Sequence, residues 1–304
     1  MFSKATRKQA RLRLALSGPS GSGKTTGALT IAKGLGGKIA VLDTERGSAS
    51  LYADQFDFDV VELAPKYTPE RYIEVIQAAE KGGYDILIID SLSHEWNGPG
   101  GCLELNEEIA KAKYRGNTWS AWNEVTPRHR RLVDTILASP MHIICTLRSK
   151  TETTQGEVNG RKVVQKLGMK AEQRDGMDYE FTTVLDISVD GHLATASKDR
   201  TRLFSDPFLI TEETGKQLKK WLNEGETPAQ TATAHNPDPM TPQHSKALMA
   251  HLTKRFGNDR KAYLEELSNF FQRSILSSRE LTKSDVASYL DAVMAGNEEY
   301  QEAV

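Results

Sequence analysis

Residues Ser17–Thr26 read SGPSGSGKTT, and this stretch decides the expected fold. The pattern G-x-x-x-x-G-K-[S/T], a loop whose backbone N–H groups surround phosphates, is filled at every fixed position by Gly18, Gly23, Lys24 and Thr25. Glycine is needed where such a loop turns through positive φ or lies close to an oxygen. A Gly/Ser-rich surface turn is the alternative interpretation. We predict a phosphate site, the P-loop, made of Gly18, Pro19, Ser20, Gly21, Ser22, Gly23, Lys24, Thr25 and Thr26.

The segments on either side of the P-loop fit this interpretation. Leu12, Leu14 and Leu16 alternate with polar or small residues, which predicts a strand, and residues 26–35 have the pattern of a helix. The helix N-terminus would then face the anion. In such loops the lysine reaches the β- and γ-phosphates and the threonine hydroxyl binds Mg²⁺. The expected cofactors are therefore ATP and Mg²⁺, with Lys24 and Thr25 in these roles.

Alternating strands and helices continue along the chain. Apolar periodicity predicts helices over 69–83 and 126–138, and strands at 38–45, 59–63, 84–90, 141–147, 180–188 and 193–200. This alternation is typical of an α/β fold with a mainly parallel sheet that is covered on both faces. The expected fold class is therefore a P-loop NTPase core.

The C-terminal part has a different composition. Residues 224–240 are rich in Pro, Thr and Ala and read as a flexible linker. Three amphipathic helices follow over 241–256, 260–274 and 281–294, with Thr241 and Thr282 as N-caps. The expected organisation is an ATPase domain (1–223), the linker (224–240), a small all-α domain (241–296) and a disordered tail (297–304).

Composition excludes several classes of protein. The chain has 304 residues and a net charge of -2, so no overall basicity indicates nucleic acid as a partner. Two cysteines give no disulfide framework. The basic N-terminus has the composition of a transit peptide, but cleavage would remove the strand that precedes the P-loop. No run approaches the ~18 apolar residues that span a membrane. We expect a cytoplasmic protein without membrane contact.

Two acidic residues are candidates for the chemistry of ATP hydrolysis. Asp90 ends the apolar run ILIID, where an aspartate holds Mg²⁺ in many P-loop ATPases. The next residue is Ser91 rather than a water-activating glutamate, so another base is needed. Glu45, in VLDTERGSA, follows the strand after the P-loop helix, at the sheet edge where nucleotides bind. A solvated glutamate in a turn is the alternative for Glu45.

These segments resemble a known family. VLDTERGSA resembles the strand-Asp-x-Glu segment of the RecA recombinase family, and IIDSLSHEW resembles its magnesium-binding strand. The resemblance covers about residues 12–204 and is greatest to the RecA-like single-strand annealing ATPases of bacteriophages. It implies a RecA-like core, with Glu45 as the catalytic glutamate and Asp90 as the magnesium aspartate. A phage protein of this kind would act in the cytoplasm of its bacterial host.

The resemblance also implies assembly. The segment TASKDRTRLF is similar to the place where RecA proteins present basic residues to the nucleotide of a neighbouring subunit, which makes Lys198 and Arg200 the matching residues. A homo-oligomer, as a ring or a filament, is expected. The alternative is that both cations are simply solvated. RecA proteins also place an Asn-Gln sensor after the strand that matches MHIIC, where this chain has Thr146 and Leu147 followed by Arg148. The residue that senses the γ-phosphate is therefore expected at Arg148 or Thr146. The alternative is that the nucleotide state is coupled to DNA binding in a different way.

Two regions combine cations with features of DNA-binding loops. Between residues 111 and 131, Trp119 and Trp122 lie among lysines and arginines, the combination that binds single strands. The second region surrounds a predicted hairpin turn at 159–160, and its basic residues are Arg148, Lys150, Arg161, Lys162 and Lys166. The resemblance implies DNA-binding loops in both intervals. The alternative is that the tryptophans pack on the core and the cations form a solvated face.

The sequence therefore predicts a DNA-stimulated ATPase that binds single-stranded DNA and promotes annealing or recombination. A single-strand binding protein or another recombination protein is a possible partner. One alternative is a DNA-independent RecA-like regulatory ATPase that acts through protein partners. Another is a P-loop small-molecule kinase, for which residues 151–176 would form the lid.

Overall fold

The computed structural model describes residues 4–158, 161–226, 241–257, 259–271, 275, 278 and 281–299. Within this part, the side chains of 151–169, Pro242 and 294–299 are not described. The chain divides into two compact units, Met1–Thr227 and Pro228–Val304. Most of the predicted linker and the residues after Glu299 in the predicted tail lie outside the described residues.

The first unit is built on a nine-stranded sheet in the order β3-β2-β4-β5-β1-β7-β8-β9, with β6 paired to β5 alone. The strands from β3 to β7 in this order are parallel, and β8 and β9 are antiparallel. Their bounds are β1 Arg13–Gly18, β2 Ile39–Asp43, β3 Asp59–Glu62, β4 Ile86–Asp90, β5 His142–Val158, β6 Arg161–Ala171, β7 Thr183–Ile187, β8 Leu193–Asp199 and β9 Phe208–Leu209.

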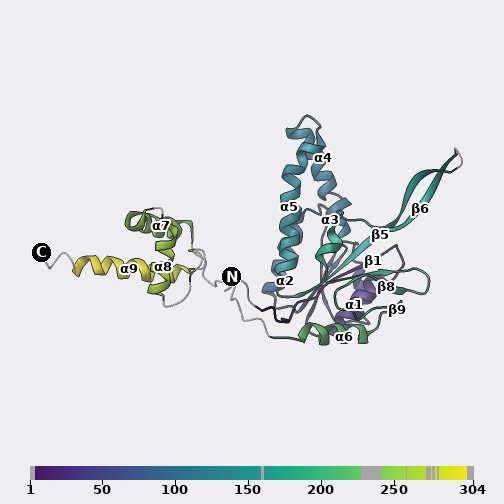
Figure 1. Ribbon diagram of the computed structural model, residues 1–304, viewed down its shortest axis with the longest axis horizontal. Helices are drawn as coiled ribbons and strands as arrows, with labels where there is room; N and C mark the ends of the chain where they lie inside the picture. Colours follow the sequence, from purple (N-terminus) through teal and green to yellow (C-terminus); the bar gives the residue numbers. More distant parts are fainter. Residues whose placement is uncertain are drawn as a thin grey trace. The chain divides into compact units, whose positions relative to one another are not determined.

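Helices cover both faces of this sheet because side chains alternate along each buried strand. In β1, Leu14 and Leu16 pack against α1 (Lys24–Leu35) and α6 (Glu212–Asn223), whereas Ala15 packs toward the opposite core. That opposite core also contains residues of α2 (Pro69–Lys81) and α5 (Thr118–Ala138). Figure 1 shows these helices around the sheet. The predicted fold class, a mainly parallel α/β P-loop core with C-terminal helices, is confirmed.

Strand order determines which residues lie near the P-loop. β5 lies between β1, which leads into the P-loop, and β4, which ends at Asp90. Parallel pairing places Leu147 and Arg148 of β5 beside Ser17 and Gly18 of β1. The carboxyl ends of β2, β4 and β5 therefore meet the P-loop at one edge of the sheet.

Two features extend beyond this layered core. After β4, the chain forms α3 (Ser93–Asn97), α4 (Cys102–Lys113) and α5, where the sequence predicted only a helix over 126–138. β5 and β6 continue as an antiparallel hairpin whose paired arms end at Val158 and Arg161, and Figure 1 shows it projecting from the sheet. The hairpin prediction is confirmed, and its arms are longer than the sequence indicated. The turn at 159–160 lies outside the described residues.

The second unit contains α7 (Pro242–Phe256), α8 (Arg260–Phe270) and α9 (Lys283–Glu299). Its buried residues Leu248, Leu252, Leu267 and Tyr289 form a core of their own. The predicted caps are confirmed: Thr241 accepts a hydrogen bond from the N–H of His244, and Thr282 accepts one from Asp285 N at 2.9 Å. These helices match the predicted positions within a few residues.

Candidate functional site

The P-loop connects β1 to the N-terminus of α1. Gly23 precedes α1 with φ 89°, a left-handed conformation that favours glycine. At Gly18, a Cβ atom would lie 2.5 Å from Ser22 Oγ and 2.7 Å from Ile187 O, so a side chain does not fit there. The loop therefore has the close backbone approach and the helix N-terminus that suit a bound phosphate chain.

Lys24 gives the loop the positive charge that suits an anion. Lys24 Nζ donates a hydrogen bond to Pro19 O at 2.7 Å, which holds the ammonium over the loop. Burial lowers the pKa of Lys24, while the charges of Asp90 and Glu45 act in the opposite direction. Ser22 Oγ is buried and has no hydrogen-bond partner among the described residues. The ammonium of Lys24 is the group that fits phosphate oxygens, whereas the buried hydroxyl of Ser22 packs beside Gly18.

Asp90 lies at the end of β4 and is buried. Its two oxygens accept hydrogen bonds from Thr25 Oγ1 at 2.6 Å and from Thr146 Oγ1 at 2.5 Å. Burial raises the pKa of Asp90, although both hydrogen bonds act to lower it. A hydroxyl and a carboxylate are ligands that Mg²⁺ accepts, and Mg²⁺ keeps most of its other positions for water and phosphate oxygens. Thr25 and Asp90 thus fit the predicted metal role.

Glu45 lies just beyond β2 and is half-buried. Its Oε1 accepts a hydrogen bond from Arg148 Nε at 2.9 Å. Burial acts to raise the pKa of Glu45, but the hydrogen bond and charge of Arg148 outweigh it, so the pKa lies below its usual value. The same contact raises the pKa of Arg148. Glu45 is therefore an ionised carboxylate beside the P-loop lysine.

His94, on α3, belongs to the same site, and sequence reasoning did not identify it. Its Nδ1 is 2.7 Å from the hydroxyl of Thr44, the residue before Glu45. Thr44 Oγ1 also accepts a hydrogen bond from Ser91 N at 2.9 Å. The ring of Tyr67 stacks on the imidazole of His94, with ring centroids 5.0 Å apart. The segments that carry Glu45 and Asp90 are tied together through these contacts. The only available signal was the closeness of His94 to Asp90 in sequence.

The comparisons with known proteins agree with this geometry. The sequence model of the AAA domain family matches residues 10–221, which is more than half of the chain. The chain belongs to the AAA domain family. It is therefore a P-loop ATPase of the AAA type, a class that implies nucleotide binding. The assignment of that binding to Gly18–Thr26 stays a prediction. No curated protein matches the sequence. In the described part of this AAA domain protein, no helix is long and apolar enough to cross a membrane.

Lys198 and Arg200 lie away from the P-loop of their own chain. Lys198, at the end of β8, donates hydrogen bonds to Asp178 O at 2.8 Å and Tyr179 O at 2.6 Å. Arg200 Nη2 donates to the same Tyr179 carbonyl at 3.3 Å. The two cations thus share one surface beside the exposed Tyr179. Their action on the nucleotide of a neighbouring subunit stays a prediction.

The AAA domain carries a groove lined by aromatic residues next to α5. Trp119 is 86% exposed, and Trp122 stacks on Trp96 with centroids 5.5 Å apart. With Asn123, Thr126, Gln173, Arg174 and Asp175, these tryptophans line a cavity of about 620 Å³, which we call the tryptophan groove. Trp96 and Arg174 were missed by sequence reasoning, because neither lies in a region of clustered charge.

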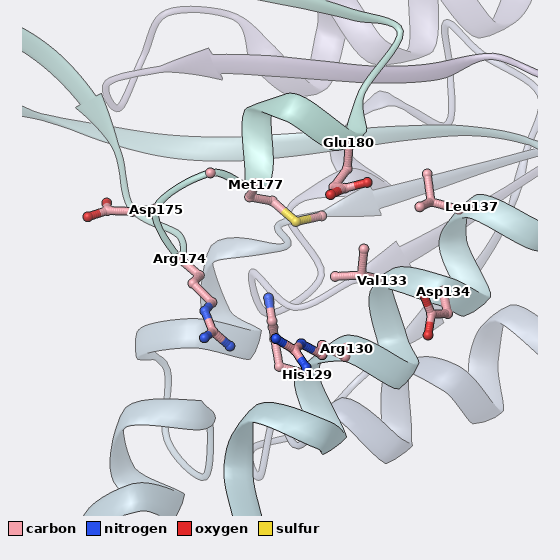
Figure 2. A pocket seen from close by; sticks show the side chains of 10 residues that line it. His129, Arg130, Val133, Asp134, Leu137, Arg174, Asp175, Met177 and Glu180 are labelled. Atoms are coloured by element: carbon pink, nitrogen blue, oxygen red, sulfur yellow. The ribbon is translucent and has the colours of Figure 1, made fainter. Parts of the chain in front are cut away.

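A second cavity adjoins the tryptophan groove, since Arg174 and Asp175 line both. It measures about 370 Å³, and Figure 2 shows Arg174 extending toward His129 and Arg130 of α5, with Glu180 and Met177 on the other side. Among the described residues, Arg174 forms no ion pair, whereas Arg128 and Arg131 are bound to Glu70 and Lys113 to Glu124. Arg174 and Arg130 are therefore the cations available along these cavities.

The structure separates the predicted DNA-contacting cations into different surroundings. Arg148 faces Glu45 at the nucleotide site, and Lys150 lies 3.6 Å from Glu172. The side chains of Arg161, Lys162 and Lys166 lie outside the described part, although their backbone forms the returning arm of the hairpin. That arm leads directly to Gln173 and Arg174 of the tryptophan groove.

Proposed function

We propose that this AAA-type ATPase binds single-stranded DNA and promotes strand annealing or recombination, as a phage-encoded homo-oligomer. The tryptophan groove is the observation that carries the proposal. The exposed indole of Trp119 suits an unstacked base, and Arg174, which has no ion pair among the described residues, suits a phosphate. Such stacking tolerates every base. At 86% exposure, Trp119 would otherwise leave a large apolar surface in water without compensation.

The hairpin provides a second support for the proposal. β5 leaves the sheet next to Arg148 and Glu45, and β6 returns to Gln173 and Arg174. One continuous segment therefore joins the ATP site to the groove. A strand that follows the groove would reach the arm that carries Arg161 and Lys162, where cations could neutralise phosphates.

Hydrolysis in this proposal uses residues whose positions are described. When bound, Mg²⁺–ATP supplies the γ-phosphoryl group and the cation that offsets its charge. Lys24 and the P-loop N–H groups would hold the phosphates, and Thr25 with Asp90 would hold the metal. Glu45 orients a water and accepts its proton. Lys198 and Arg200 of an adjacent copy would add positive charge when subunits assemble, which would explain stimulation by DNA through assembly.

The test measures single-strand binding by fluorescence anisotropy, together with ATP hydrolysis in the presence and absence of the strand. We expect Trp119→Ala to weaken binding by about 1–3 kcal/mol with an almost unchanged salt dependence. Trp119→Phe keeps a stacking face and should retain most of the affinity. Equal affinity in Trp119→Ala and the unsubstituted protein would exclude the groove as the binding site.

The hairpin is tested by the double variant Arg161→Ala/Lys162→Ala. Loss of two phosphate contacts should lower the slope of log affinity against log salt by about 1.4 for single strands. Affinity should fall equally for all sequences, because phosphate contacts do not read bases. The matched control is Lys216→Ala/Lys220→Ala on the exposed face of α6, which should keep the full slope. Absence of any binding or stimulation at low salt would favour a regulatory ATPase that acts through protein partners.

A further inference from the structure

Three helices of the segment after β4 bring a thiol, an imidazole and a carboxylate together. Glu95 comes from α3, Cys102 is the first residue of α4, and His129 lies in the middle of α5. All three side chains are buried, with Glu95 and Cys102 at 0% exposure and His129 at 5%. Their potential ligand atoms lie within 4.8 Å of one another. None of these residues takes part in the ATP site.

The contacts in this cluster converge on one carboxylate. Cys102 Sγ and His129 Nδ1 both lie 3.0 Å from Glu95 Oε1. Gln173 Nε2 donates to the other oxygen, Oε2, at 3.3 Å, and His129 Nδ1 also lies 3.3 Å from this oxygen, slightly farther than from Oε1. A hydrogen bond from an amide to the outer oxygen of a carboxylate is the usual support of a metal ligand, because it fixes the orientation of the inner oxygen. Oε1 is thus held toward Cys102 and His129.

The carboxylate, thiol and imidazole of the cluster favour one kind of metal ion over others. We propose that Glu95, Cys102 and His129 bind a zinc ion that joins α3, α4 and α5. Zinc accepts thiolate, imidazole and carboxylate ligands in one tetrahedral site, whereas Mg²⁺ and Ca²⁺ require oxygen ligands. The three donors leave one position for water, and His129 borders the cavity in Figure 2 from which water could enter.

Protons must leave when the ion binds. Burial raises the pKa of the Cys102 thiol well above its usual value, so the metal-free protein keeps the thiol protonated against Glu95. Zinc binding replaces that proton, which passes to solvent, and requires His129 to present an unprotonated Nδ1. In the zinc form, one thiolate and one carboxylate balance the charge of the divalent ion.

The site is separate from the magnesium ligands at the P-loop in both position and chemistry. Thr25 and Asp90 offer oxygen atoms alone, and Asp90 lies on β4 rather than on the helices that follow it. A thiolate ligand therefore identifies ions bound at Cys102. It also separates this inference from the proposed DNA function, since zinc content is measured without DNA or ATP.

The experiment uses the full-length, untagged protein, stripped with a chelator and then loaded with zinc or cobalt. We expect about one zinc per chain after removal of free metal, and a near-ultraviolet charge-transfer band from a cobalt–thiolate bond in the cobalt form. The matched variants are Cys102→Ala and Cys145→Ala, since Cys145 is equally buried but lies in β5, outside the cluster. Only Cys102→Ala should lose the zinc and the band.

Three outcomes would overturn the proposal. These are zinc content below about a tenth of an ion per chain, a cobalt form without the thiolate band, or equal zinc content in Cys102→Ala and the unsubstituted protein. If Cys102→Ala fails to fold, the cobalt spectra of Cys145→Ala and the unsubstituted protein show whether Cys102 binds the metal. A thiolate band in Cys145→Ala can come only from Cys102, because the chain has two cysteines.

Discussion

Glu45 and Asp90 are both carboxylates at the edge of the sheet, and their hydrogen bonds give them different roles. Both oxygens of Asp90 accept threonine hydroxyls. Glu45 uses Oε1 for Arg148, and in the described part of the chain Oε2 accepts no hydrogen bond. Glu45 therefore offers an oxygen without a hydrogen bond in the described part of the chain, which suits it to accept a proton from water.

This difference is tested with Glu45→Gln. The amide occupies the same space without the base, so we expect ATP to bind while turnover falls by at least about 100-fold. Binding is measured with a fluorescent ATP analogue, and turnover by phosphate release. Lys24→Ala serves as the comparison and should lose turnover together with phosphate contacts. Normal turnover in Glu45→Gln would assign the water to another residue.

Arg148 should set the pH range of hydrolysis. It holds the pKa of Glu45 below its usual value against the opposing effect of burial. In Arg148→Ala burial remains and the lowering contact is lost, so the pKa of Glu45 rises. Because the base acts when ionised, the acidic limb of the kcat profile should move to higher pH. Arg148→Lys keeps a positive charge, so its acidic limb should fall between those of the unsubstituted protein and Arg148→Ala. An unshifted acidic limb in Arg148→Ala would contradict the role of Arg148 in lowering the pKa of Glu45.

Some residues of the site could be predicted from the sequence and others could not. Lys24, Thr25 and Asp90 follow from local motifs, because each lies at a fixed distance from a strand end. The contact of Arg148 with Glu45 depends on the position of β5 between β4 and β1, which no local pattern specifies. His94 was missed for the same reason, because its partner Thr44 is distant in sequence.

At the scale of elements, Arg13 joins β1 to the end of α5. It is buried, and its guanidinium donates hydrogen bonds to the carbonyls of Leu12, Leu137, Ser139 and Met141. Burial lowers the pKa of Arg13 to about 10. The cation lies at a helix C-terminus, where positive charge is favourable.

Replacement of this cation should weaken the connection between helix and sheet. We expect Arg13→Leu to reduce the free energy of unfolding by about 2–4 kcal/mol, because it leaves several carbonyls without a donor. Chemical denaturation followed by circular dichroism measures the change. Arg11→Leu, at an exposed position on the same strand approach, should stay within about 0.5 kcal/mol of the unsubstituted protein. Similar stabilities for the two variants would show that Arg13 is dispensable.

The elements that the sequence missed have physical explanations. α5 begins at Thr118 and continues through Pro127, where the predicted helix started near residue 126. Proline inside a helix removes a hydrogen bond and normally ends the periodic pattern, but packing of α5 against α2 and α4 compensates here. The arm of β5 beyond Arg148 is polar up to Val158, and in β6 the apolar residues Val163 and Val164 are adjacent, so alternation of hydrophobicity did not indicate the length of the arms.

At the scale of the whole molecule, the two units have separate cores. Lys24, Glu45, Asp90 and Arg148 all belong to the first unit. We expect a chain that ends at Thr227 to fold and to keep basal ATP hydrolysis within about twofold, since no catalytic contact is removed. Thermal unfolding and phosphate release test this expectation. Loss of basal turnover with an intact fold would assign a catalytic role to the second unit.

The short helix α3 has a spectroscopic consequence. Ser93 accepts a hydrogen bond from Arg148 N at 2.9 Å, and three residues later Trp96 stacks on Trp122. The contact with Ser93 is made by the backbone N–H of Arg148, so a nucleotide that shifts the backbone of β5 at this residue would move one end of a helix of five residues. The other end of that helix holds an indole pair. Intrinsic fluorescence should therefore change when a non-hydrolysable ATP analogue is added. The change should be lost in Trp96→Phe, so this protein carries its own optical reporter of nucleotide occupancy.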